Sequence, residues 1–246
     1  MLLALLADIH SNRQAFSACL DDAAARGATG FALLGDYVGY GADPVWCVDT
    51  CMALAGAGAV AVQGNHDQAI GSPSPGMNEE AEFALDWTRR QLGVEERGFL
   101  SSLPLTITDG DILYVHSDAS APQRWIYVRT VEEAARSLRA TTARITFCGH
   151  THRPLVFSTT PLSKMTVFTP VSGVPIPLQG YRRWLVVLGS VGQPRDGIAA
   201  ACYALFDTAA SEITYVRVPY DIDAAAAAIL DAKLPPFFAT RLYSGR

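Results

Sequence analysis

The chain lacks a long apolar run, and this absence excludes a membrane-spanning helix. No stretch approaches 18 uninterrupted apolar residues, which a helix needs to cross a bilayer. The apolar start, residues 1–7, is far too short for the apolar region of a signal peptide. We therefore expect no targeting segment and no membrane partner.

The chain also lacks an excess of positive charge and a paired cysteine pattern. Its formal net charge is −5 at pH 7, which argues against a surface that neutralises the phosphates of a nucleic-acid duplex. The five cysteines form an odd set without paired spacing, at positions 19, 47, 51, 148 and 202. We predict that they are reduced, buried thiols of a cytoplasmic protein.

The composition that remains is that of a globular protein with a sizeable core. Half of the 246 residues are hydrophobic and only 17% are charged. This length suits one large α/β domain or two small ones. Because no repeat, linker or shift of composition divides the chain, we predict a single domain over residues 1–246.

Strand and helix patterns alternate in the first quarter of the chain. Apolar runs predict buried strands at residues 2–7, 30–34 and 60–62, and capped or proline-initiated stretches predict helices at residues 12–26 and from Pro44 onward. Ser11 or Asn12 is the candidate cap of the first helix. This order implies parallel strands with right-handed crossovers. Polar motifs begin where each apolar run ends, so we expect them at one rim of the sheet.

The rest of the chain mixes helices with short strands. The pattern predicts helices from Asn78 and over residues 132–139 and 223–232, a hairpin over 106–115, a strand over 144–148 and short strands between 155 and 218. Gly71-Ser72-Pro73-Ser74-Pro75-Gly76 predicts a surface loop. Whether this Gly71–Gly76 loop acts as a lid stays open at this point.

All five histidines lie in short segments that also carry Asp, Asn or Gly. The segments are Asp8-Ile9-His10, Gly64-Asn65-His66-Asp67, Tyr114-Val115-His116 and Gly149-His150-Thr151-His152, and Gly35-Asp36 adds a further carboxylate. Histidine is the commonest metal ligand, and carboxylates suit hard divalent ions. The pattern indicates a hydrolase site for two metal ions that only folding can assemble.

Each residue taken alone has a structural alternative. Asp8 and Asp36 can be capping or turn residues, and Asn65 beside Gly64 can belong to an ordinary turn. A histidine such as His116, at the end of a strand, can be a satisfied structural residue. Five ordered motifs would all need such explanations at once, which favours the metal site.

The order of the motifs resembles that of the calcineurin-like metallophosphoesterase superfamily, in particular its small bacterial phosphodiesterase-like branch. The series Asp-x-His, Gly-Asp, Gly-Asn-His-Asp, His and Gly-His-x-His runs from Asp8 to His152. The stretch Gly189-Ser190-Val191-Gly192-Gln193-Pro194-Arg195-Asp196-Gly197 resembles the same branch. The resemblance implies an α/β fold: a four-layer α/β/β/α sandwich of two mixed sheets flanked by helices.

The resemblance also implies a role for each matching residue. One metal ion would be bound by Asp8, His10 and His152, the other by Asn65, His116 and His150, with Asp36 bridging the two. His66 would be the catalytic histidine that protonates or stabilises the leaving oxygen, and Asp67 would orient its ring. The two divalent ions, Mn²⁺ first with Fe or Zn²⁺ as alternatives, would share a hydroxide that attacks phosphorus.

One departure concerns the cation that would bind the substrate's phosphate. In the protein-phosphatase branch the second motif continues as Gly-Asp-x-x-Asp-Arg-Gly, whereas Gly39-Tyr40 stands here in place of Asp-Arg. The other candidates are Arg124, Arg129 and Arg195, and Arg195 is preferred because glycine and proline bound its loop. The alternative is a surface arginine that pairs with Asp196. Asn12 is a further substrate-binding candidate.

The function implied is therefore a metal-dependent phosphoric ester hydrolase. Its small phosphorylated substrate would be a phosphodiester, a phosphomonoester or a nucleotide phosphoanhydride, with dinucleoside polyphosphates or phosphoproteins as alternatives. The alternative of another class is a catalytically silent metal-binding scaffold or regulatory protein of the same fold. Such proteins typically lose ligands or the catalytic histidine, whereas every position is filled here. The sequence makes no prediction of the oligomeric state.

Overall fold

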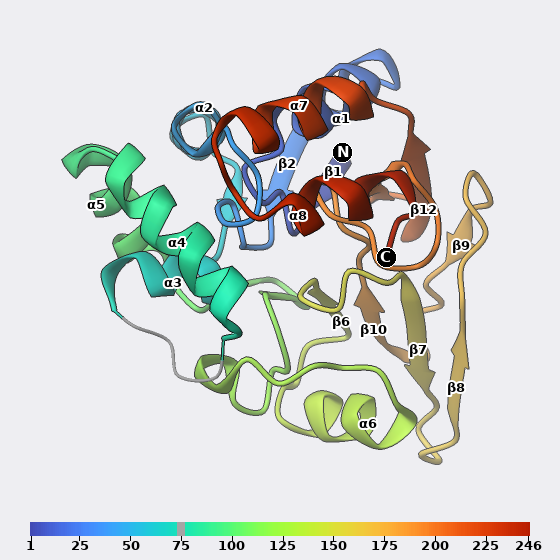
Figure 1. The fold of residues 1–246 in the computed structure, drawn as a ribbon. Coiled ribbons are helices and arrows are strands. Elements are labelled where there is room, and N and C mark those ends of the chain that lie inside the picture. The colour runs from blue at the N-terminus through green and yellow to red at the C-terminus, as the bar shows by residue number, and fades with distance from the viewer. Residues whose placement is uncertain (73–76) are drawn as a thin grey trace.

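Two six-stranded sheets form the centre of the protein in the computed structural model, which describes residues 1–72 and 77–246 (Figure 1). The first sheet has the order β3-β2-β1-β11-β12-β9. Its strands are β1 (Leu2–Leu6), β2 (Gly30–Leu33), β3 (Val60–Ala61), β9 (Ile176–Pro177), β11 (Ala201–Asp207) and β12 (Glu212–Val218). The second sheet has the order β4-β5-β6-β10-β7-β8. Its strands are β4 (Thr106–Asp109), β5 (Ile112–Val115), β6 (Ile145–Cys148), β7 (Leu155–Thr159), β8 (Met165–Phe168) and β10 (Arg183–Val187).

Both sheets are mixed, and each contains three neighbouring parallel strands. In the first sheet β1, β2 and β3 run parallel, while β11 pairs antiparallel with β1. In the second sheet β5, β6 and β10 run parallel, while β4 and β7 pair antiparallel with β5 and β10. The parallel strands expected from the alternating pattern near the N-terminus are thus confirmed.

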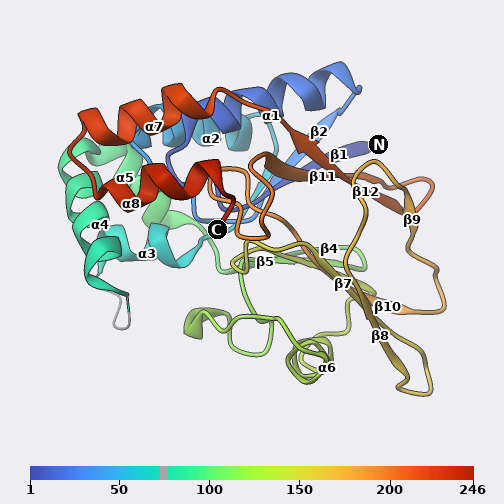
Figure 2. The ribbon, with the colours of Figure 1, turned by 45° about the vertical axis from the view of Figure 1, so that its right-hand side comes forward.

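Helices cover the outer faces of the two sheets, which gives four layers (Figure 2). Helices α1 (Arg13–Ala25) and α2 (Pro44–Gly56) lie over the first sheet, and α6 (Val131–Arg139) lies over the second. Side chains along β1 alternate between two cores: Leu3 and Leu5 pack between the sheets, and Ala4 and Leu6 pack beneath the helices. The predicted four-layer α/β/β/α sandwich is confirmed.

Local signals placed most helix starts to within a residue or two. Asn12 caps α1 with its side-chain oxygen, which accepts a hydrogen bond of 3.0 Å from the amide of Ala15. Asn78 caps α4 (Glu79–Gln91) in the same way, with a hydrogen bond of 2.8 Å from Ala81. Helix α7 (Ile222–Asp231) packs against α1, close to its predicted place.

The sequence did not reveal three short helices. Helix α3 (Asn65–Gly71) begins within the histidine motif after β3, where the sequence predicted metal-binding residues at a strand end, or alternatively an ordinary turn, but no helix. Helix α5 (Val94–Ser102) starts after Gly93 without a side-chain cap, and α8 (Pro236–Thr240) is too short for a periodic pattern. Of the predicted Gly71–Gly76 loop, residues 73–76 lie outside the described residues, and Gly71 ends α3. Its lid role is untested.

Two compositional expectations can be compared with the structure. All five cysteines are buried and free of disulfides, as predicted. In the described parts of the chain, no helix is both long and apolar enough to cross a bilayer.

Candidate metal centre

The carboxyl ends of the parallel strands of both sheets meet at one rim, and the histidine motifs lie there. Asp8 and His10 follow β1, Asp36 follows β2, and His116 follows β5. His150 and His152 follow β6 on the second sheet. The placement at strand ends is as predicted, and it brings together segments more than 140 residues apart, since His10 contacts His152.

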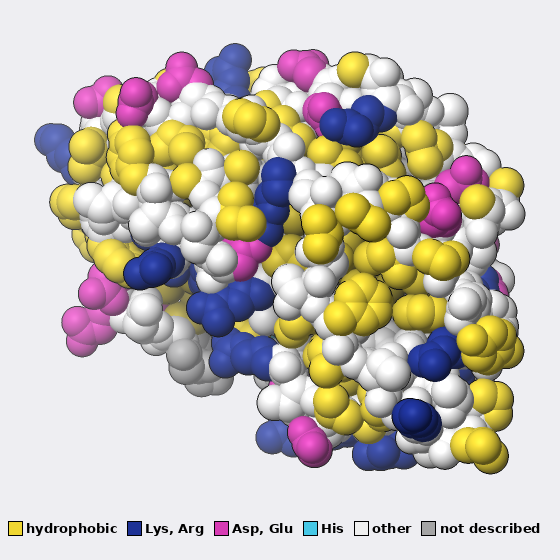
Figure 3. Space-filling model, turned by 90° about the vertical axis from the view of Figure 1, so that its right-hand side faces the viewer, with side chains coloured by type: hydrophobic (Ala, Val, Ile, Leu, Met, Phe, Trp, Pro, Cys, Tyr) yellow, Lys and Arg dark blue, Asp and Glu magenta, His cyan; other side chains and the backbone are white. Residues whose placement is uncertain are grey.

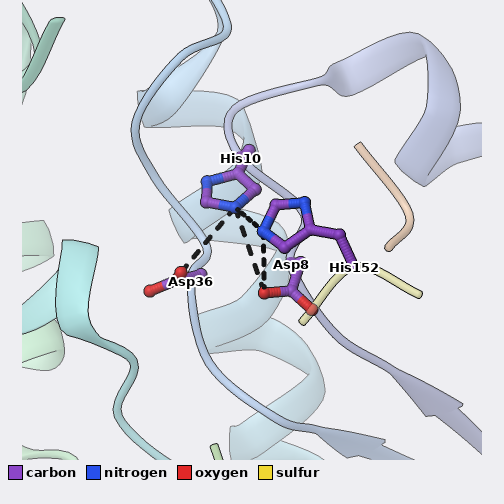
Figure 4. Close-up of side chains that lie close together, drawn as sticks. All are labelled: Asp8, His10, Asp36 and His152. Carbon is purple, nitrogen blue, oxygen red and sulfur yellow. Dashed lines mark hydrogen bonds and ion pairs between the residues drawn. The ribbon is translucent and has the colours of Figure 1, made fainter. Parts of the chain in front are cut away.

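Four side chains form the first cluster: Asp8, His10, Asp36 and His152, all of them buried. Figure 4 shows them pointing toward one another. The Nε2 atom of His152 lies 3.3 Å from Oδ1 of Asp8, and Nε2 of His10 lies 3.7 Å from Oδ2 of Asp36. Separations of this size suit ligands that each lie about 2.0–2.2 Å from one metal ion.

Asp36 also belongs to the second cluster, with His116 and His150. Its Oδ2 atom lies 3.3 Å from Nε2 of His116. Asn65 lines the same cavity as Asp36 and His150, and its side-chain oxygen is buried without a hydrogen-bond partner in the described structure. A buried acceptor without a donor is costly, and a cation would satisfy it.

Backbone carbonyls fix the tautomer of each histidine in the two clusters. The Nδ1 atoms of His10, His116 and His152 lie 3.0, 2.6 and 2.7 Å from the carbonyl oxygens of Val38, Leu34 and Gln193. In His150 it is Nε2 that lies 2.8 Å from the carbonyl oxygen of Trp125. A carbonyl oxygen only accepts, so these nitrogens carry the hydrogen and the other nitrogen of each neutral ring carries a lone pair.

The inward nitrogens of these rings face each other in two places. Nε2 of His10 lies 3.1 Å from Nε2 of His152, and Nε2 of His116 lies 3.2 Å from Nδ1 of His150. Two lone pairs at this distance repel unless a cation or a proton lies between or beside them. The donor set therefore fits a divalent metal ion at each of the two clusters, with Asp36 next to both.

The backbone is strained where it presents these ligands. Asp8, His10, Asp36, His150 and His152 all have φ between 50° and 64°, in the left-handed region. Non-glycine residues rarely adopt this conformation, although Asp and His do so more than most. Such strain persists only where the surroundings impose it, and it concentrates at functional sites.

Glycines permit the close approach of the strand ends. A Cβ atom on Gly64 would lie 2.2 Å from the backbone nitrogen of Asp36, and one on Gly39 would lie 2.4 Å from Nδ1 of His66. Gly39 also has φ of 92°. A larger residue at either position would displace Asp36 or His66.

Burial keeps most of the histidines neutral, as metal ligands must be. It lowers the pKa of His66 to about 4 and the pKa of His150 to about 3. It also lowers the pKa values of His10 and His152 well below the usual range, helped at His152 by the charge of Arg195.

His116 and the two aspartates behave differently. Burial by itself would lower the pKa of His116, but the carboxylates of Asp36 and Asp8 outweigh burial and raise it to about 9. Burial raises the pKa of Asp8 to about 7 against the influence of His116. Burial opposes ionisation of Asp36, yet His116 and His66 hold its pKa well below the usual value. The field at the centre therefore favours a positive charge.

His66 lies beside both clusters but differs from the other histidines. Its ring is 4.8 Å from the ring of His10 and 4.6 Å from that of Tyr40, centroid to centroid. Its Nδ1 atom is buried and has no hydrogen-bond partner among the described residues. The ring is thus left free of the carbonyl contacts that fix the four other imidazoles.

The expected contact between Asp67 and His66 is wrong. Oδ2 of Asp67 accepts hydrogen bonds of 2.8 Å from the amides of Asp36 and Gly64, and Oδ1 accepts one of 2.9 Å from the amide of Tyr37. Both oxygens are therefore occupied by backbone donors. Asp67 holds the loop that carries Asp36 against the start of α3, because three buried amides need an acceptor there.

The substrate-binding role expected for Asn12 stays a prediction, and the contacts of its side chain in the structure are with the protein itself. Its side-chain oxygen caps α1, and its Nδ2 atom donates a hydrogen bond of 2.9 Å to the carbonyl of Gly192. Both ends of the amide are used within the protein. The alternative role, that of a helix cap, is the one observed.

The stretch from Gly189 to Gly197 supports the first cluster from behind. Its Ser190 hydroxyl donates a hydrogen bond of 2.8 Å to the carbonyl of Asp8, and the carbonyl of Gln193 accepts from His152. The sequence suggested no role for these two residues. Contacts between positions 8 and 190 leave no trace in local spacing.

A cavity of about 610 Å³ opens beside the clusters. Asp36, Asn65, His66, His150 and His152 line it together with further side chains. These are Tyr40, Met77, Asn78, Glu80, Ala81, Arg124, Trp125, Tyr127, Arg195, Phe237, Phe238 and Arg241. Trp125, Tyr127, Phe237, Phe238 and Arg241 were not predicted, since they come from a loop and a C-terminal segment without a motif.

Arg195 lies at this cavity and not in the predicted alternative contact. Asp196 pairs instead with Arg217. Arg195 donates a hydrogen bond of 2.9 Å to the side chain of Gln193, and its guanidinium carbon lies 5.7 Å from the centre of the Tyr40 ring. Tyr40, which occupies the position of the missing arginine, is therefore covered by an arginine from another part of the chain.

The two other candidate arginines have distinct surroundings. Arg124 lines the cavity. Arg129 stacks on Tyr127, with its guanidinium carbon 3.8 Å from the ring centre, and Tyr127 stacks on His150 at 4.1 Å. Tyr127 thus packs against one face of the ring of His150, which is a predicted metal ligand.

Comparison with known proteins shows clear similarity along the whole chain. Residues 1–211 match the model of the calcineurin-like phosphoesterase superfamily domain. An uncharacterized protein of Methanocaldococcus jannaschii is 34% identical, in an alignment that covers 100% of this chain and 98% of that protein.

Solved structures show the same architecture. A metallophosphoesterase from Sphaerobacter thermophilus is 35% identical, with a TM-score of 0.89, over 100% of this chain and 99% of that one. A hypothetical protein from Pyrococcus horikoshii OT3 is 21% identical, with a TM-score of 0.79, over 100% of this chain and 98% of that one, and this second likeness concerns the fold alone.

Proposed function

This chain belongs to the calcineurin-like phosphoesterase superfamily, and from that premise we propose that it hydrolyses small phosphate esters with two divalent metal ions. Asp8, His10 and His152 would hold one ion, and Asn65, His116 and His150 the other. Asp36 would contact both, because it belongs to both clusters.

The converging imidazole nitrogens support this proposal most directly. Four imidazoles are anchored by backbone carbonyls so that their free nitrogens converge in pairs at 3.1 and 3.2 Å. Structural histidines usually have both nitrogens satisfied by protein groups. When bound, two divalent ions would supply Lewis-acid stabilisation of the phosphoryl oxygens and a water of lowered pKa.

The chain's own side chains complete the proposed chemistry. His66 is neutral and unanchored, so we assign it the exchange of a proton with the leaving oxygen. Arg195 would offset the negative charge of the substrate from the cavity wall. Because the Nδ1 atom of His66 is buried without a hydrogen-bond partner in the described structure, His66 favours an enzyme over a catalytically silent scaffold.

The volume of the cavity favours small substrates. Its volume of about 610 Å³ lies in the range of small-molecule sites. Tyr40 replaces the arginine of the protein-phosphatase branch, which makes a phosphoprotein the less favoured substrate. Phosphodiesters, phosphomonoesters and nucleotide anhydrides, including dinucleoside polyphosphates, remain in the proposal. The nitrogen and oxygen ligands suit Mn²⁺, Fe or Zn²⁺, and we propose Mn²⁺ first.

Other parts of the proposal concern the setting of the protein. Five free, buried thiols fit a reducing compartment, so we propose a cytoplasmic location. The single domain over residues 1–246 stays a prediction.

The test is hydrolysis of an activated aryl phosphodiester by the Mn²⁺-loaded protein, before and after chelation. Asp36→Asn is expected to lose bound metal by elemental analysis, together with turnover. Cys148→Ser serves as the control, because Cys148 is buried at the end of β6 and belongs to neither cluster. Activity that survives thorough chelation, or equal metal loss in both variants, would contradict the proposal.

A further inference from the structure

A second cavity, of about 690 Å³, adjoins the one beside the metal centre. The two cavities share Arg195 and Arg241, which line both. The second cavity is lined by Arg129, Thr151, Arg153, Pro154, Leu155, Thr169, Arg195, Asp196, Gly197, Arg241 and Arg246. We call its five arginines (Arg129, Arg153, Arg195, Arg241 and Arg246) the arginine groove.

The arginine groove carries a local excess of positive charge in an acidic protein. The whole chain has a net charge of −5. Asp196 is the one acidic residue among the lining residues, and it is paired with Arg217, outside the groove. Figure 3 shows Lys and Arg side chains gathered along one part of the face that it displays. The charge of the groove is therefore a feature of this place and not of the composition.

Protein contacts hold the arginines and neutralise only part of their charge. Nε of Arg153 donates a hydrogen bond of 2.6 Å to the carbonyl of Arg195, and Arg241 donates to a carboxyl oxygen of Arg246, the last residue of the sequence. In the described chain, no Asp or Glu carboxylate lies within ion-pair distance of any of the five guanidinium groups. Burial, with the nearby charge of Arg195, lowers the pKa of Arg241 to about 10.

Several like charges held close together destabilise the folded state unless an anion offsets them. Guanidinium groups match the geometry of phosphate oxygens and bind them through paired hydrogen bonds. The shared residues Arg195 and Arg241 connect this positive groove to the cavity where the metal ligands lie. A ligand that extends from one cavity into the other would need negative charge at both ends.

We propose that the arginine groove is an anion subsite for a further phosphate group of the substrate, so that the preferred substrate is a small molecule with at least two phosphates. The proposal rests on the proposed function, because the first phosphate would lie at the metal centre. Arg241 and Arg246 lie beyond residue 211, where the family model ends. The C-terminal segment therefore adds a specificity-determining wall to the domain.

The first experiment compares binding of inorganic tripolyphosphate and orthophosphate to the metal-loaded protein by calorimetry. Wild-type protein should bind tripolyphosphate at least about tenfold more tightly, with an affinity that falls as salt is raised. Arg241→Gln should weaken tripolyphosphate binding about ten- to a hundredfold, as expected for a lost charge-assisted hydrogen bond, and orthophosphate binding much less.

Two further variants separate the subsite from other effects. Arg153→Gln should show the same selective loss from a second position in the groove. Arg139→Gln removes the same charge from the exposed last turn of α6, away from both cavities, and should bind like wild type. Unfolding midpoints of all variants identify any that fail to fold.

Three results would overturn the subsite. The first is equal affinity of the wild-type protein for tripolyphosphate and orthophosphate. The second is tripolyphosphate binding by both groove variants that equals binding by Arg139→Gln. Alternatively, a single-stranded oligonucleotide without a terminal phosphate would displace tripolyphosphate with higher affinity, which indicates a nucleic-acid groove.

Turnover of an aryl phosphodiester by the same preparations tests the proposed function separately. Turnover without selective tripolyphosphate binding would contradict the proposed subsite but support the proposed phosphoesterase activity. Selective binding without any turnover would remove the substrate role, and with it the proposal as stated.

Discussion

Asp67→Asn tests whether Asp67 holds the metal-binding loop or orients His66. In the structure its two oxygens accept three backbone hydrogen bonds of 2.8 to 2.9 Å, from Asp36, Gly64 and Tyr37. An asparagine has one oxygen, and its NH₂ group cannot accept. At least one of the three buried amides would then face another donor.

The expected loss of stability in Asp67→Asn follows from the number of hydrogen bonds that the substitution breaks or weakens. A buried amide left without an acceptor costs about 1–3 kcal/mol, and replacing a charged acceptor by a neutral one weakens the remaining bonds. We expect the free energy of unfolding to fall by about 2–4 kcal/mol. Metal affinity should fall about 10–100-fold, as for other groups that support a ligand from behind, because the loop that carries Asp36 is no longer fixed.

Denaturant unfolding and elemental analysis measure the two effects. Asp111→Asn is the matched control, since Asp111 is exposed and pairs with Arg144 at the surface, where ion pairs contribute little. If Asp67 oriented His66 instead, the variant would lose turnover while keeping its stability and its metal. An unfolding free energy within about 0.5 kcal/mol of wild type would refute the reasoning.

Three further predictions concern the centre and its cavity. His66→Ala should keep its metal and lose about 10²–10⁴-fold in turnover, less for substrates with acidic leaving groups; release of metal, or equal slowing of good and poor leaving groups, would contradict its role. Arg195→Ala should lower kcat/KM for polyphosphorylated substrates, with a loss of transition-state stabilisation of about 1.5–3 kcal/mol, and should lower it less for a singly charged aryl diester. Unchanged kinetics on both substrates would make Arg195 a surface residue. Because the pKa of His116 is raised to about 9, its ring carries a second proton, on Nε2, at pH 7, and a metal ion must displace this proton. Metal binding should therefore release about one proton and tighten as pH rises from about 7 to 9; calorimetry in two buffers of different ionisation heat would detect this release, and its absence would contradict the expectation.

The position of the site was predictable because it depends on a local rule. Buried strands appear in the sequence as short apolar runs, and the carboxyl ends of parallel strands meet at one edge. Asp8, Asp36 and His116 each follow such a run, and the structure places each of them at the rim. The helix cap at Asn12 was predictable for the same reason, since capping involves only the next three residues.

The support of the site was not predictable, because it depends on contacts between distant segments. The carbonyls of Leu34 and Gln193 hold histidines that lie 82 and 41 residues away in the chain. The actual contacts of Asp67 reach 30 and 31 residues back, to Tyr37 and Asp36, although His66 is its neighbour. Proximity in sequence suggested the wrong partner, because adjacent residues of a helix point in different directions.

The distribution of backbone anchors separates the histidines into two groups. The imidazoles of His10, His116, His150 and His152 each donate to a carbonyl, which fixes the ring and directs one lone pair inward. Such fixed rings suit metal ligands, which must hold their geometry through a reaction cycle. A ring that gives up and regains a proton needs a nitrogen that is not already committed to a metal ion or to a backbone acceptor. His66 alone among the five histidines has no such anchor in the described structure, so the same contacts that identify the ligands also identify the residue that we assign to proton transfer.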